Sequence, residues 1–320
     1  MAVSESDIAP LSAERNALDW VLFGILTVMW ASAYALTRIA VDKDNPTAGL
    51  PVEWVLSGRL TIGAIVLLGL MFAFGQRLPP LSDRRRWAYI AVMGVVGSVI
   101  PFYCITTAQQ TVNSSLAALY TSAAPIFVGI GAHFIFNDER LSGRKIIGGL
   151  IGFCGVAVLF GPDAFQGFSN ASTIAQILLV GATMAYSASS LIARRAPPIP
   201  SIAFAAGFIS VAAVITWPLA LSVEASEVSA DWRNWASVIA LGAGPSAVGQ
   251  ALYMILVRRA GATFLSLTGY SIPIVSVAIG WVLFRQKPEW KARIAFALIL
   301  CGVWLAKNNK RQPKVSERLH

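Results

Sequence analysis

The residue with the clearest chemical potential in this chain is a single arginine inside an apolar stretch. Arg59 follows Pro51 by eight residues, about 12 Å along a helix that rises 1.5 Å per residue. A charged group at such depth in a membrane helix is expensive and is therefore a candidate functional group. Its guanidinium could face a wet cavity and hold an anionic group such as a carboxylate. Alternatively, it could reach helix-end carbonyls and serve the structure alone; the sequence leaves both interpretations open.

Aromatic and polar side chains also recur on single helix faces within apolar stretches. Trp30 and Tyr34 stand four residues apart and therefore share a face. The same spacing relates Tyr103 to Thr107, Tyr120 to Ala124, Tyr186 to Ser190, Gln250 to Met254 and Ser266 to Tyr270. If these faces converge, they form an apolar pocket with hydrogen-bonding edges for a small amphipathic metabolite, whereas lipid-facing packing is the alternative for each residue. The predicted substrate-binding residues are Trp30, Tyr34, Arg59, Tyr103, Tyr120, Tyr186, Gln250 and Tyr270.

Residues for catalysis or cofactor binding are scarce. The three cysteines, Cys104, Cys154 and Cys301, lie singly in apolar stretches, where cysteine usually serves packing. The two histidines are His133 and the terminal His320. The HExxH, GxSxG and Walker motifs are missing from the sequence. We therefore expect no enzyme activity, no cofactor and no metal site.

Composition indicates an all-α integral membrane protein. Hydrophobic residues make up 56% of the chain and charged residues 13%, against about 25% charged in soluble domains. A bilayer core about 30 Å thick requires about 20 apolar residues per helix. The apolar runs predict ten spans, at 20–40, 51–74, 87–107, 112–136, 145–161, 171–193, 200–221, 235–257, 263–284 and 290–306.

The two halves of the chain repeat each other. When SAAPIFVGIGAHFIF (122–136) is aligned with YSIPIVSVAIGWVLF (270–284), Pro125 matches Pro273. An earlier match pairs Met29, Ser32, Ala33 and Leu36 with Met184, Ser187, Ala188 and Leu191. Weak internal symmetry of this kind is typical of duplicated transporter folds. We predict a first five-helix repeat (20–161) and an inverted second one (171–306), between an N-terminal tail (1–19) and a basic C-terminal tail (307–320).

The net charge of +9 reflects orientation in the membrane. With the N-terminus inside, seventeen Lys and Arg residues fall on the cytoplasmic side and seven on the outer side. This bias predicts that both termini lie in the cytoplasm. The basic loop 285–293 is an exception, which its origin as the duplicate of loop 137–145 would explain. Lipid is thus the expected surroundings, and nucleic-acid binding is not expected.

Prolines and glycines punctuate the predicted spans. Pro101, Pro125, Pro245 and Pro273 each remove a backbone hydrogen bond and kink a helix. Such breaks bound binding sites or serve gating in transporters, although kinks that merely shape packing are as common. Pro125 and Pro273, which are equivalent, are the predicted gating residues. The Gly148-xxx-Gly152 face favours close packing within the chain over dimerisation, and a monomer or homodimer is expected.

Several short motifs, taken in their order along the chain, resemble those of the drug/metabolite transporter superfamily, specifically its EamA-type ten-helix members. The resemblance covers about residues 20–306. It is carried by Trp30-Ala31-Ser32, Pro51 with Arg59, Leu116-Ala117-Ala118-Leu119, Pro125 and Glu139-Arg140-Leu141. Two departures are Lys287, which stands where the first half has Glu139, and Asp138 in place of a commoner glycine.

The resemblance implies two inverted repeats around a central cavity, alternating access and location in a bacterial inner membrane. It further implies export of a small amphipathic metabolite such as an amino acid, with no cofactor. A multidrug exporter of cations is the main alternative, although no deep acidic residue supports it. A phosphorylated-sugar carrier would need more cavity-facing cations than Arg59, and a membrane scaffold that transports nothing remains a further alternative.

Overall fold

The computed structural model describes residues 16–42, 49–112, 114–136, 142–170, 173–224, 231–261, 264–265, 267–275 and 290–306, and these residues contain helices and no strands. The helices of the first half are α1 (Ala17–Val41), α2 (Val52–Ala73), α3 (Arg84–Gly94), η2 (Val95–Val99), α4 (Ile100–Ala108), α5 (Ser114–Thr121), α6 (Ala124–Ile135) and α7 (Gly143–Asn170). Those of the second half are α8 (Thr173–Arg195), α9 (Ser201–Leu221), α10 (Trp232–Leu241), η4 (Gly242–Val248), α11 (Gly249–Ala260) and α14 (Trp290–Ala306).

Seven helical stretches are long and apolar enough to cross a membrane: Ala17–Val41, Val52–Ala73, Arg84–Ala108, Ala117–Ile135, Thr173–Arg195, Ser201–Leu221 and Trp232–Ala260. They correspond to seven of the ten predicted spans. The predicted span 145–161 lies within α7, and the span 290–306 is α14. Part of the span 263–284 lies outside the described residues. The chain is thus an integral membrane protein built from helices.

The helices α2 and α9 pack side by side in opposite directions, along a large hydrophobic core. Near the end of α2, the Gln76 side chain accepts hydrogen bonds from the backbone N–H groups of Ile202 and Ala203, at 3.1 and 3.0 Å. Near its start, the Ser57 hydroxyl donates to the carbonyl of Thr216, at 2.9 Å. Fully buried side chains fill the space between these two ties, among them Leu60, Leu67, Phe204 and Phe208.

Two of the predicted spans, each expected to be kinked at a proline, contain π-helical turns. In Arg84–Ala108 the turn is η2, and Pro101 follows it at the start of α4. In Trp232–Ala260 the turn is η4, which contains Pro245. A proline lacks the N–H group of the regular α-helical ladder, and π turns are frequent at functional sites. The two turns occupy corresponding places in the two halves of the sequence.

The predicted span 112–136 is divided at its proline. α5 ends at Thr121, a turn occupies Ser122 and Ala123, and α6 begins with Pro125 in its first turn. This position suits proline because the first helical turn requires no internal N–H donor. Pro273, by contrast, lies inside the helical residues 268–275.

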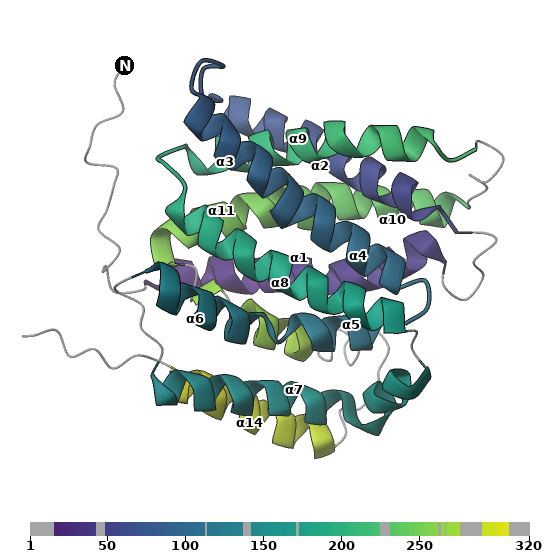
Figure 1. Cartoon of the computed structure of the whole chain (residues 1–320), viewed down its shortest axis with the longest axis vertical. Coiled ribbons are helices and arrows are strands. Elements are labelled where there is room, and N and C mark those ends of the chain that lie inside the picture. The colour runs from purple at the N-terminus through teal and green to yellow at the C-terminus, as the bar shows by residue number, and fades with distance from the viewer. Residues whose placement is uncertain are drawn as a thin grey trace, which may run out of the picture.

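The pair α7 and α14 forms one edge of the molecule (Figure 1). Their approach is so close that a Cβ added to Gly302 would lie 2.5 Å from the Gly148 carbonyl oxygen and 2.6 Å from the Gly152 backbone nitrogen. The glycine face identified in the sequence therefore packs against α14 of the same chain.

Candidate functional site

A central cavity lies among helices from both halves of the chain. Its walls come from α1, α2, α3, η2, α4, α5, α6, α8, η4, α11 and residues 265 and 268–272. The residues at its surface are Trp30, Ala33, Tyr34, Thr37, Arg59, Met93, Gly97, Phe102, Ile105, Thr121, Ala124, Val128, Tyr186, Ser189, Ser190, Pro245, Gln250, Tyr253, Leu265, Thr268, Gly269 and Ile272. Most of these side chains are apolar or aromatic, and acidic residues are lacking among them.

Among the described residues that line this cavity, Arg59 is the charged one. It is 5% exposed, and its Nε and Nη2 donate to the Ser246 hydroxyl at 3.1 and 3.0 Å. Its guanidinium carbon also lies 3.8 Å from the centre of the Phe102 ring. Both partners are neutral, and within the described part of the chain Arg59 forms no ion pair. A buried cation without a counter-ion is costly, so this position suits an anionic ligand.

Three further polar groups at the cavity have no hydrogen-bonding partner among the described residues. The Gln250 side chain, the Tyr186 hydroxyl and the Trp30 indole N–H line the cavity and form no hydrogen bond there. Gln250 lies one helical turn beyond Ser246, the residue bonded to Arg59, so the two share a face. Tyr186 packs edge-on against Phe102, with ring centres 6.4 Å apart. Hydrogen-bonding capacity is therefore concentrated near Arg59.

Other polar groups of the wall are occupied in holding the helices together. The hydroxyls of Tyr34 and Thr121 lie 2.6 Å apart and join α1 to α5. The Tyr253 hydroxyl donates to the Ser190 hydroxyl at 2.9 Å and joins α11 to α8. The ring of Tyr253 also packs against Trp30, with centres 5.4 Å apart. These contacts restrict the orientations of the Tyr34 and Tyr253 side chains.

The structure brings five of the eight predicted binding residues to the cavity and places three elsewhere. Trp30, Tyr34, Arg59, Tyr186 and Gln250 are at the cavity surface. Of the others, Tyr103 packs against the hydrophobic core. The Tyr120 hydroxyl donates to Gln176 at 3.2 Å. The Tyr270 hydroxyl donates to the Gly149 carbonyl of α7 at 3.0 Å. A role in binding stays a prediction for these three, as it does for the five that line the cavity.

The predicted gating prolines lie beside the cavity wall. A Cβ added to Gly269 would lie 3.2 Å from Pro125 Cδ, so the start of α6 is in close contact with the helical residues around 269. Pro125 and Pro273 are not among the cavity-lining residues, whereas Pro245 is.

Tyr253 and Phe102 are the important cavity residues that the sequence analysis missed. Tyr253 follows Gln250 by three residues, which places both on one helix face, so this spacing could have identified it. Phe102 follows a proline at the start of α4, and no sequence signal distinguishes it from an ordinary apolar residue.

Comparison with known proteins agrees with the membrane fold. The model of the EamA-like transporter family matches the sequence twice, over residues 18–161 and 173–307. The chain therefore belongs to the EamA-like transporter family. Its family and its relatives are those of a transporter rather than of an enzyme.

Curated relatives match over most of their length. The probable terminal-alkyne amino-acid exporter of Streptantibioticus cattleyicolor is 26% identical, with 89% of this chain and 92% of that protein covered. The aromatic amino acid exporter YddG of Ancylobacter novellus is 26% identical, with 89% and 96% covered. The uncharacterized transporter YetK of Bacillus subtilis is 24% identical, with 95% and 96% covered. A protein of known crystal structure shares the fold, with a TM-score of 0.69, 23% identity and coverage of 88% of this chain and 97% of that one.

Proposed function

We propose that this protein exports a small amphipathic carboxylate, such as an amino acid, across the bacterial inner membrane by alternating access. The carboxylate binds Arg59, and the remainder of the substrate contacts the aromatic walls of the cavity. The observation that carries the proposal is the burial of Arg59 at the cavity without an acidic partner among the described residues. Two relatives whose names include amino-acid export support the same substrate class and direction.

The proposal includes ten spans arranged as two inverted five-helix repeats, with both termini in the cytoplasm. Two matches to one family model support the duplication. The antiparallel packing of α2 and α9 supports the inversion, because these helices occupy equivalent places in the two halves. A repeat inverted in the membrane places equivalent helices in opposite directions. Pro125 and Pro273 are the proposed gating residues in this scheme.

The chemistry of binding follows from the groups around Arg59. A guanidinium and a carboxylate form charge-assisted hydrogen bonds that can be bidentate. Ser246 holds the guanidinium from one side, and the Gln250 amide can accept from the substrate's amino group. Acidic residues are lacking among the described residues at the cavity surface, which disfavours a cationic drug as substrate because none of these side chains would balance its charge.

A binding experiment with an amino acid and its amide tests the proposal. The two ligands differ in the charge that Arg59 is proposed to bind, so purified wild-type protein should bind the acid at least about tenfold more tightly, as expected for one charge-assisted contact. Ligand-induced thermal shifts provide the readout, because binding to the folded state raises apparent stability. The Arg59→Met variant should lose this preference for the acid.

The matched control is Thr61→Val, on the same helix. Thr61 accepts a hydrogen bond from Trp217 and is not at the cavity surface. This variant should keep the preference for the acid. Equal binding of acid and amide by the wild-type protein, or tighter binding of organic cations, would contradict the proposal.

A further inference from the structure

The cavity has chemically different ends. Arg59, Gln250 and Tyr186 gather the charge and the free hydrogen-bonding groups near α2 and η4. The opposite wall is formed by α6, by the last residue of α5 and by residues 265 and 268–272. Figure 1 shows α2 and α6 on opposite sides of α1 and α8.

Those residues of this wall that the structure describes offer a substrate almost no free polar group. Its apolar members are Ala124, Val128, Leu265 and Ile272. Its two threonines have their hydroxyls occupied. The Thr268 hydroxyl donates to the Leu265 carbonyl at 2.6 Å. The Thr121 hydroxyl is bonded to the Ala118 carbonyl at 3.0 Å and to Tyr34. Such a wall suits an uncharged, apolar group.

Ala124 is a small side chain on this wall, and its backbone is held in place. The Ser187 hydroxyl of α8 donates to the Ala124 carbonyl at 3.3 Å. The next residue, Pro125, lies against Gly269, where even one added carbon would be tightly packed. Because the backbone is fixed on both sides, a larger side chain at position 124 would extend into the cavity rather than move the helix away.

We propose that the wall formed by α6 and residues 265 and 268–272 binds the side chain of the substrate, and that Ala124 limits the size of the side chain accepted. This inference rests on the proposed function and adds a substrate class to it: carboxylates with an uncharged, apolar side chain, held with the carboxylate at α2 and the side chain at α6. Ala124 is thus a specificity-determining residue.

Competition among neutral amino acids of increasing size tests this inference. A labelled amino acid bound by the purified protein is displaced by alanine, leucine, phenylalanine or tryptophan, and the half-displacing concentration of each is measured. In Ala124→Leu, the value for tryptophan should rise at least about tenfold, because apolar pockets discriminate about 10- to 200-fold per methylene. The value for alanine should change less than about twofold.

Two further variants complete the experiment. Ala35→Leu makes the same change at an exposed position of α1 that does not line the cavity, and it should leave the order of the competitors unchanged. Ile272→Ala enlarges the space beside the same wall and should favour the binding of tryptophan over that of alanine. This second variant tests the inference even if Ala124→Leu does not fold.

The outcomes separate the two proposals. Binding of no amino acid by the wild-type protein would overturn the proposed function, and the size limit with it. Amino-acid binding in which Ala124→Leu and Ile272→Ala change all competitors equally would overturn the size limit alone. Tight displacement by lysine or glutamate would contradict an apolar site for the side chain.

Discussion

At the scale of single residues, the central observation is that Arg59 is buried at the cavity among neutral neighbours. Ser246 and Phe102 position the guanidinium, but neither neutralises its charge. A buried structural cation would be expected to have an acidic partner, because an unpaired charge away from water is costly. The arrangement is therefore better suited to a ligand that brings the negative charge than to a stabilising contact.

Replacing Arg59 should leave the protein stable while it removes ligand binding. In Arg59→Met, the loss of an unpaired buried charge offsets the loss of two hydrogen bonds to Ser246, and replacing buried charges by apolar groups is often neutral or stabilising. We expect the apparent melting temperature in detergent to stay within about 4 °C of the wild-type value or to rise. A fall of more than about 8 °C would indicate that Arg59 is mainly structural.

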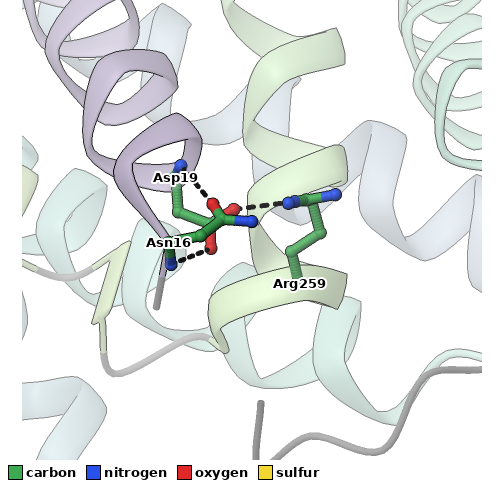
Figure 2. Close-up of polar contacts among 3 residues, drawn as sticks. All are labelled: Asn16, Asp19 and Arg259. Carbon is green, nitrogen blue, oxygen red and sulfur yellow. Dashed lines mark hydrogen bonds and ion pairs between the residues drawn. The ribbon is translucent and has the colours of Figure 1, made fainter. Parts of the chain in front are cut away.

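At the scale of elements, the N-terminal end of α1 is tied to the C-terminal end of α11 (Figure 2). The Asn16 side chain accepts from the Asp19 N–H at 3.0 Å, and the Asp19 carboxylate accepts from the Asn16 N–H at 3.3 Å. This reciprocal capping box satisfies two free backbone donors of the helix. Arg259 Nε donates to the same carboxylate at 2.7 Å. Asp19 thus caps its own helix and pairs with another.

The double role of Asp19 predicts unequal effects of removing the two partners. Arg259 is partly exposed, with 41% of its side-chain surface accessible, so Arg259→Ala should lower stability by at most about 1 kcal/mol. Asp19→Ala removes the same ion pair and also half of the capping box, so it should lower stability by about 1 kcal/mol more than Arg259→Ala does. Thermal unfolding of both single variants and the double variant measures this. Fully additive effects would contradict a shared contact.

The sequence predicts the spans of this protein better than it predicts which face of each helix points inward. The pair Trp30 and Tyr34 is predicted to share a face, and both line the cavity. Tyr103 and Tyr270 follow the same reasoning, yet Tyr103 packs in the core and Tyr270 against α7. Spacing along a helix defines which residues share a face, whereas the rotation of that face depends on neighbours distant in sequence. The break before α6 was foreseeable from Pro125, but the π turns were not.

At the scale of the whole molecule, the proposed duplication explains why the charge lies at one end of the cavity. α2 and α9 both begin directly after a proline, Pro51 and Pro200. Eight residues later stands Arg59 in the first helix and Phe208 in the second, and Phe208 lies in the hydrophobic core. Similar backbones therefore carry a cation on one side only, which gives the cavity a direction in which an amphipathic substrate can bind.

Counterflow in liposomes most directly tests the claim that this cavity carries a carboxylate across the membrane. Vesicles that contain the protein and an unlabelled neutral amino acid are diluted into a trace of the labelled one. We predict transient accumulation of label by the wild-type protein, reduced accumulation with Arg59→Lys because its single ammonium cannot form a bidentate contact, and none above empty vesicles with Arg59→Met. Accumulation by Arg59→Met at the wild-type level, or none by the wild-type protein with any amino acid, would contradict the account.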